Sequence, residues 1–276
     1  MILSSNERAR RLLERALPLL RCPACTGTAL TLEVDAPALT CGPCGRRYAY
    51  ANGILNLYTG PELFTFAQRS LQTKVSTMLY ERFRWLLAKA VIGHTLREEV
   101  EQFRQTLVLN AGDNLLDVAC GPGNFTLPMA RIVQPGLVIG LDISPAQLAR
   151  AATNLARTKL DNVLLVRGDI HKLPLRDGIV AKVNCAGGLH QFPDPAKALA
   201  EVARVMPAGG RFSGSTLARH RDAKAQRLQQ WLQQRSDCHF VDLAALVGMV
   251  EGAGLKDYRH RSAPSPWFGY YAAAKA

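Results

Sequence analysis

The sequence of 276 residues lacks the features that would place it in a special structural class. No apolar run reaches the roughly 18 residues that a membrane-spanning helix needs, so we expect no membrane span. Internal repeats and low-complexity tracts are also absent, which excludes solenoids and fibrous arrays. The hydrophobic content of 48% and the charged content of 20% are typical of an ordinary globular protein.

Long blocks of one charge are missing as well. The net charge is +12, but the excess of Lys and Arg is spread along the whole chain. A spread excess is typical of a solvated basic surface, and binding of an anionic partner such as RNA stays an alternative.

A disulfide framework is excluded by the cysteines. There are seven, an odd number, and four lie in the close pairs Cys22-Pro-Ala-Cys25 and Cys41-Gly-Pro-Cys44. This spacing predicts a zinc ribbon in which four thiolates surround one ion and leave no open position, so the zinc is expected to be structural. Free thiols are typical of a reducing compartment, and we expect a cytoplasmic protein.

The chain divides into four predicted parts. Residues 1–20 form an amphipathic helix, which we prefer to a targeting peptide. Residues 21–60 form the zinc ribbon, called the ribbon below, and residues 61–110 form a helical lid or linker. Residues 111–276 form an α/β domain.

Short apolar runs alternate with amphipathic helices in this last part. The predicted strands are Leu115–Ala119, Leu137–Leu141, Val163–Arg167, Ile179–Asn184 and Arg211–Thr216. Ser144 and Asp194 each precede a proline and predict helix starts, with Gln147 completing a capping box at the first. The alternation predicts a doubly wound, mostly parallel sheet, and β-like runs at 256–263 and 267–274 predict a hairpin at its edge.

The most informative stretch is a strand that enters a glycine turn, Asp117-Val-Ala-Cys120-Gly121-Pro-Gly123. Bare backbone at the two glycines lets a ligand approach closely. Thr126 stands where a dinucleotide-binding fingerprint has a small residue. This departure favours a nucleoside ligand that is smaller than a dinucleotide. Asp117 precedes the turn and suits a cationic or amino-acid ligand.

Acidic residues also end the next two predicted strands. Asp142 is placed to accept hydrogen bonds from ribose hydroxyls. Asp169 can accept from an exocyclic amine while Ile170 packs on a purine face. A single acid at a strand end is usually a helix cap, but acids at three successive strands predict a ligand crevice.

Four motifs follow one another in the chain: Asp117-x-x-x-Gly121-x-Gly123, Leu141-Asp142-Ile-Ser, Gly168-Asp169-Ile-x-x-Leu-Pro and Val205-Met-Pro-x-Gly209-Gly210. In this order they resemble the class I S-adenosylmethionine-dependent methyltransferases over roughly residues 80–276. The resemblance implies a seven-stranded sheet that binds S-adenosylmethionine. The Gly121 turn would hold the methionine moiety, and the backbone of Asn184–Ala186 would pass beneath the sulfonium.

The residues expected to bind the cofactor are Tyr80, Asp117, Ala119, Cys120, Gly121, Gly123, Asp142, Ile143, Gln147, Gly168, Asp169, Ile170, Asn184, Cys185 and Ala186. Methyl transfer from a sulfonium needs little acid–base help, because the leaving group departs neutral. His190 is the candidate base for an acceptor that must lose a proton, with a structural histidine as the alternative.

The leading hypothesis for the function is methyl transfer to a small organic acceptor. The segment Cys185-Ala-Gly-Gly-Leu-His190-Gln-Phe-Pro-Asp-Pro resembles quinone-ring and natural-product methyltransferases, and we expect residues 61–110 and 218–238 to enclose the pocket. An RNA-base methyltransferase that docks through its ribbon is the alternative, because a similar ribbon precedes an rRNA guanine methyltransferase. The ribbon also resembles that of the methyltransferase-activator family, and a non-enzymatic cofactor-bound scaffold is the third hypothesis.

Overall fold

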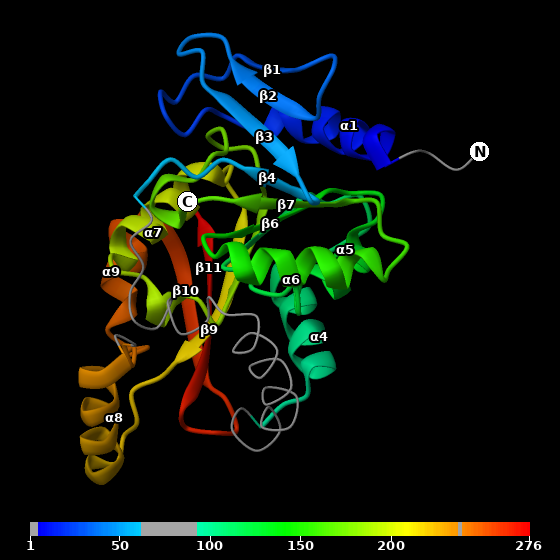
Figure 1. Ribbon diagram of the computed structural model, residues 1–276. Coiled ribbons are helices and arrows are strands. Elements are labelled where there is room, and N and C mark those ends of the chain that lie inside the picture. Colours follow the sequence, from blue (N-terminus) through cyan, green and yellow to red (C-terminus); the bar gives the residue numbers. More distant parts are fainter. Residues whose placement is uncertain (1–4, 62–92, 237–238) are drawn as a thin grey trace.

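A single twisted sheet with helices on both faces forms the centre of the computed structural model, which describes residues 5–61, 93–236 and 239–276 (Figure 1). The strands are β1 (Leu30–Leu32), β2 (Ala38–Cys41), β3 (Arg47–Ala51), β4 (Ile54–Asn56), β5 (Leu115–Val118), β6 (Val138–Asp142), β7 (Val163–Arg167), β8 (Lys182–Ala186), β9 (Arg211–Leu217), β10 (Leu255–Ser262) and β11 (Phe268–Lys275). The α-helices are α1 (Ser5–Ala16), α4 (Leu96–Leu107), α5 (Thr126–Val133), α6 (Pro145–Ala156), α7 (Pro195–Val205), α8 (Ala223–Ser236) and α9 (Leu246–Gly252). None of the helices in these ranges is long and apolar enough to cross a membrane.

The predicted sheet of seven strands is wrong in number, because the sheet has eleven strands in the order β1-β2-β3-β4-β7-β6-β5-β8-β9-β11-β10. The seven strands from β5 to β11 are present, and the ribbon adds the other four. The two parts join where β4 pairs in parallel with β7, with Ile54 opposite Leu165. Without β4, the edge of β7 would present unpaired backbone groups, and the ribbon covers this edge.

Most of the predicted elements are found close to their expected bounds. β7 spans the predicted residues, and β10 and β11 form the expected antiparallel hairpin. β8 begins later than the predicted strand over 179–184, because the N–H groups of Ile179 and Val180 donate to the carbonyl of Val205 at the end of α7.

The two predicted helix starts are present, with one change, and a third well-marked start lies at Thr95. The side chains of Ser144 and Asp194 accept from the backbone of α6 and α7, and Thr95 forms a full capping box with Glu98. The capping box predicted at Ser144 is only half formed. The Ser144 N–H donates to Asp142 instead (2.8 Å), which leaves the Gln147 side chain available for another role.

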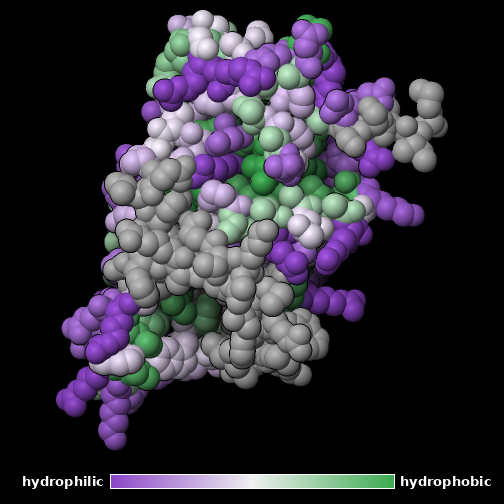
Figure 2. Space-filling view, viewed as in Figure 1, coloured by the Kyte–Doolittle hydropathy of each residue, from purple (hydrophilic) through white to green (hydrophobic). Residues whose placement is uncertain are grey.

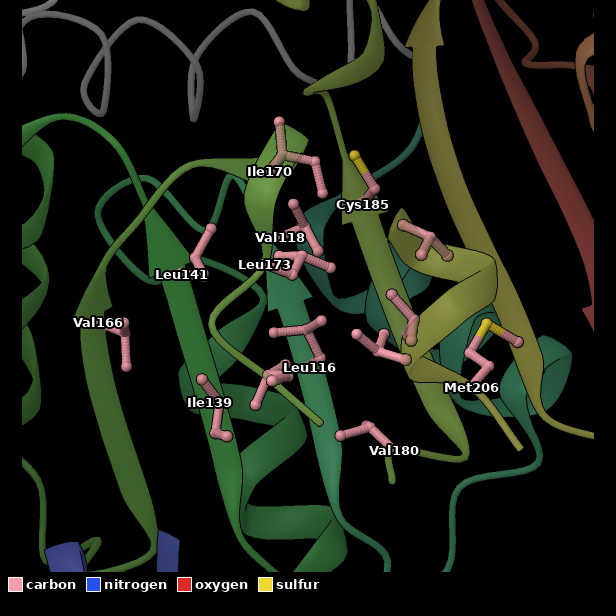
Figure 3. Packing of buried hydrophobic residues seen from close by; sticks show 14 of the residues in the cluster. Leu116, Val118, Ile139, Leu141, Val166, Ile170, Leu173, Val180, Cys185 and Met206 are labelled. Atoms are coloured by element: carbon pink, nitrogen blue, oxygen red, sulfur yellow. The ribbon is translucent and has the colours of Figure 1, made fainter. Parts of the chain in front are cut away.

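One face of the central sheet packs against α7 and the segments around it. Leu116 and Val118 of β5 and Ile139 and Leu141 of β6 project to the same side of the sheet, as alternate residues of a strand must (Figure 3). Met206 meets them from the end of α7, and all belong to one cluster of buried residues.

The ribbon shares this core with the rest of the chain. Leu39 and Leu55 of the ribbon, together with Leu13 of α1, are fully buried in the same cluster as the residues of β5 and β6. Backbone hydrogen bonds reinforce the contact, since the Arg21 N–H donates to Pro174 and the Arg176 N–H donates to Leu19. The ribbon is therefore a continuation of the sheet and core.

α8 projects from the opposite end of the molecule (Figure 1). Its one buried residue is Gln229, whose side chain bonds to the backbone of Ala218 and His220. Leu228 and Trp231 remain 48% and 49% exposed, and the surface around this helix is mostly hydrophilic (Figure 2).

Candidate cofactor cleft and cysteine cluster

A cavity of about 330 Å³ opens at the carboxyl ends of the central parallel strands, and we call it the cofactor cleft. Carboxyl ends of parallel strands meet at one edge of a sheet, which is where open α/β sheets bind ligands. The predicted residues that line it are Ala119, Cys120, Gly121, Asp142, Ile143, Gln147, Gly168, Asp169, Ile170 and Ala186. The structure thus brings together residues from four strand ends.

The turn after β5 forms one wall of the cleft. Gly121 has a φ of +54°, in the left-handed region that favours glycine, and a Cβ there would face Gln147 Oε1 at 3.8 Å. Gly123 also has a positive φ but does not line the cleft, and a Cβ would lie 3.4 Å from Leu127. Gly121 is therefore positioned for ligand approach, while Gly123 serves the turn and its packing.

Asp142 links this turn to the start of α6. Its Oδ2 accepts from the Gly121 N–H and its Oδ1 accepts from the Ser144 N–H, both at 2.8 Å. Burial raises the pKa of Asp142, although these backbone hydrogen bonds oppose the rise. A carboxylate oxygen can accept more than one hydrogen bond, so hydroxyl groups of a ligand can still be bound.

Asp117 does not line the cleft, in contrast to the ligand contact that we expected. It is 1% exposed, and it accepts hydrogen bonds from Thr126 Oγ1 (2.6 Å) and Asn184 Nδ2 (2.8 Å). Burial raises its pKa to about 6. Asp117 therefore joins β5 to α5 and β8, and Thr126 is its partner. Asn184 and Cys185 also lie outside the lining.

Asp169 forms a pair with His171, a residue that sequence reasoning missed. The Asp169 carboxylate accepts from the His171 N–H (2.9 Å) and contacts His171 Nδ1 (2.8 Å). Burial raises the pKa of Asp169, but the hydrogen bonds from His171 outweigh burial and lower the pKa. The other ring nitrogen, His171 Nε2, is buried without a hydrogen-bond partner among the described residues.

Gln147 presents a second unpartnered atom in the same cleft. Its Oε1 is buried and has no hydrogen-bond partner in the described part of the chain. Buried polar atoms are nearly always satisfied in native proteins. Two such atoms from residues that line one cleft fit a polar ligand such as a nucleoside.

Other residues that line the cleft were not predicted: Tyr58, Pro61, Val118, Pro122, Asn124, Phe125, Leu141, Ser144, Gly187, Gly188, Gln191, Phe192 and Pro193. Most are neighbours of predicted residues, so a wider window around each motif would have found them. Tyr58 comes from the end of the ribbon and Pro61 is the first residue of the predicted lid or linker; no local pattern there indicates a ligand.

His190 lies outside the cleft lining and is 7% exposed. Its Nδ1 faces the backbone N–H of Leu217 at 3.5 Å. Burial, with a smaller contribution from His239, lowers its pKa to about 4, so the imidazole is neutral near pH 7. Its role as a base stays a prediction. Tyr80 lies outside the described residues.

The predicted enclosure of the pocket is only partly described. Residues 62–92 and 237–238 lie outside the described ranges. Within those ranges, neither residues 93–110 nor residues 218–236 line the cleft. α8 does not enclose it, because the helix projects away from the sheet (Figure 1).

The four cysteines of the ribbon come together as the cysteine cluster. The Sγ atoms of Cys22, Cys25, Cys41 and Cys44 all lie within 4.8 Å of one another. Cys22 Sγ also contacts the hydroxyl of Tyr48 at 2.9 Å. Four thiols in such an arrangement fit the tetrahedral geometry of zinc.

The fold and the cofactor cleft define an S-adenosylmethionine-dependent methyltransferase. Residues 109–261, more than half of the chain, match a family described as a methyltransferase domain. The chain belongs to this methyltransferase domain family.

Individual relatives agree with this assignment. The chain is 28% identical to a demethylmenaquinone methyltransferase of Lactiplantibacillus plantarum, over 70% of this chain and 77% of that protein. It is 29% identical to an uncharacterised chloroplastic methyltransferase of Arabidopsis thaliana over 65% of this chain, but spans only 54% of that protein. Among solved structures, phosphoethanolamine N-methyltransferase 2 of Haemonchus contortus has the same fold, with a TM-score of 0.65 at 14% identity over 78% of this chain and 61% of that one.

Proposed function

We propose that the protein transfers a methyl group from S-adenosylmethionine to a small organic acceptor with a quinone-like or other natural-product-like ring. One observation carries the proposal: the loop after β8, with Gly187, Gln191, Phe192 and Pro193, forms a wall of the cleft. The cavity volume of about 330 Å³ lies within the range of small-molecule sites. The similarity to a demethylmenaquinone methyltransferase supports this class of acceptor.

The residues of the cleft fit the cofactor. S-adenosylmethionine supplies an activated methyl group on a sulfonium. The Gly121 turn would lie along its methionine part, and Asp142 would accept from the ribose hydroxyls. Asp169 and Ile170 would recognise the adenine. Gln147 and His171 offer further polar atoms that have no protein partner among the described residues.

Orientation and exclusion of water are the main contributions of the protein to the proposed step. Phe192 and Pro193 give the loop after β8 an apolar surface. An acceptor that arrives as a phenolate or as an electron-rich ring carbon needs no base to begin the transfer. His190 is buried outside the cleft and its lowered pKa of about 4 makes it a weak base, which favours such an acceptor.

We also propose that the cysteine cluster binds one structural zinc ion. Its four thiolates would close the coordination shell, so the metal would have no open position for catalysis. The ribbon is short, and small units of this size usually need a metal or a disulfide to fold. The cytoplasmic location expected from the free thiols stays a prediction.

Calorimetry and a transfer assay test the proposed function. S-adenosylhomocysteine should bind the full chain with a one-to-one stoichiometry, and a short-chain demethylmenaquinol should be methylated. An rRNA fragment serves as the competing acceptor, assayed at low and moderate salt because RNA binding would weaken steeply with salt. Methylation of the RNA without methylation of the quinol would overturn the proposal in favour of an RNA-base enzyme.

A further inference from the structure

We propose that the ribbon completes the cofactor site, with Tyr58 acting as a nucleoside-contacting residue that Arg167 holds in place. The inference rests on the proposed function for the identity of the cofactor. It assigns to the ribbon a direct part in ligand binding, beyond stabilisation of the fold or docking of a partner.

The pairing of β4 with β7 positions Tyr58 at the cleft. β4 runs in parallel with β7, and its last residue, Asn56, lies opposite Arg167. The next N–H, of Leu57, donates to the Arg167 carbonyl at 2.9 Å. The ribbon thus follows β7 to its carboxyl end. Tyr58 follows two residues after the end of β4 and lines the same cleft as Gly168 and Asp169.

The Tyr58 side chain is held at both ends. The Arg167 guanidinium lies over the Tyr58 ring, 4.8 Å from its centroid, and Arg167 Nε donates to the carbonyl of Ile143 at 3.2 Å. The Tyr58 hydroxyl donates to the carbonyl of Pro61 at 2.6 Å. A ring ordered before the ligand arrives adds affinity, because little conformational freedom is then lost on binding.

Arg167 and its hydrogen-bond partner Ile143 indicate which part of the cofactor Tyr58 contacts. Ile143 follows Asp142, the proposed ribose acceptor, and Arg167 precedes Gly168 and Asp169, the proposed adenine site. Ile143 lines the cleft and Arg167 directly precedes two lining residues, so Tyr58 lies at the proposed nucleoside end. Loss of an aromatic ring that contacts a base typically weakens binding about fivefold to a hundredfold.

Calorimetry with S-adenosylhomocysteine on the full chain tests the proposal. Tyr58→Ala should weaken binding about tenfold, whereas Tyr58→Phe, which keeps the ring, should stay within about twofold of the unaltered protein. Tyr50→Ala is the matched control, because Tyr50 also belongs to the ribbon and packs on its core but does not line the cleft. It should leave the affinity unchanged.

A second substitution separates direct contact from loss of stability. Arg167→Leu should weaken binding when Tyr58 is present and have little further effect in the Tyr58→Ala background, because Arg167 acts by holding the ring. Thermal unfolding of each variant checks that it is folded, and Tyr58→Leu replaces Tyr58→Ala if the latter is not. Equal affinity of Tyr58→Ala and the unaltered protein would overturn the inference. Failure of the unaltered protein to bind would instead count against the proposed function.

Discussion

The cysteine cluster and the cofactor cleft are built on one sheet in opposite ways. The cluster takes its four ligands from the short stretch Cys22–Cys44. The cleft takes its walls from residues as far apart as Tyr58 and Pro193, which meet only because parallel strands end at a common edge. A local site can be predicted from residue spacing, whereas a distributed site also depends on sheet topology.

Zinc removal has the largest expected effect and tests the cysteine cluster, the local site of the two. The protein should contain one zinc ion per chain, and a strong chelator should lower the free energy of unfolding by about 5 kcal/mol or more, as measured in urea. Cys44→Ser should act in the same direction. Cys185→Ala, outside the cluster, should leave the zinc content unchanged. A metal-free protein with an unchanged urea midpoint would contradict the assignment.

The second largest effect concerns His190, which is buried near the cleft without lining it. Its pKa of about 4 lies below the ordinary histidine value, so the unfolded chain binds more protons between about pH 6.5 and pH 4. The free energy of unfolding should therefore fall by a total of about 3 kcal/mol as the pH drops through this window. His190→Gln should remove this loss in urea unfolding.

Comparing His190→Gln with the unaltered protein also cancels the contribution of Asp117 to the pH dependence of stability, which opposes that of His190. Asp117 has a raised pKa of about 6, so the folded state binds more protons than the unfolded state between about pH 4 and pH 6. Its effect on the pH slope has the opposite sign to that of His190. The difference between His190→Gln and the unaltered protein isolates the histidine. Identical pH profiles of the two would contradict its burial as a neutral group.

Asp142→Asn tests the distributed site itself. The substitution removes a charged acceptor for the ribose and weakens the bond to the Gly121 N–H, at an expected cost of about 2 kcal/mol, or about thirtyfold in affinity for S-adenosylhomocysteine. Asp194→Asn is the control, because Asp194 caps α7 outside the cleft. If Asp142→Asn bound with full affinity, the ribose assignment would be wrong.

Thr126→Val has the smallest expected effect and tests whether the Asp117–Thr126 pair serves stability or ligand binding. Loss of the hydrogen bond to Asp117 should lower the free energy of unfolding by about 1 kcal/mol. Affinity for S-adenosylhomocysteine should stay within about twofold, because neither residue lines the cleft. A large loss of affinity with unchanged stability would return Asp117 to the binding site.

Much of the fold was predictable because its signals are local. Apolar runs gave β5, β6, β7 and β9 to within a few residues, and Ser144-Pro145 marked the start of α6. Gly121 and Asp142 both line the cleft, and their roles in binding the cofactor stay predictions. Each of these depends on neighbours in the sequence.

The errors arose where tertiary pairing decides the outcome. Asp117 belongs to the methyltransferase motif, but its contacts with Thr126 and Asn184 keep it out of the cleft lining, and its contact with the cofactor stays a prediction. His171 and Tyr58 line the cleft through contacts with Asp169 and Arg167 that no spacing rule specifies. The strand count was wrong for the same reason, because the sequence of a short strand such as β4 does not indicate which distant strand it pairs with.

The pairing of β4 with β7 also sets an order of events during synthesis. Ile54 leaves the ribosome long before its partner Leu165, so the outer edge of β4 stays unpaired while the intervening chain is made. The cysteines, by contrast, are all available early. Closing such a long loop is slow compared with forming local turns. The strand that leads to Tyr58 therefore reaches its final place later than the local turns that bring the cysteines together.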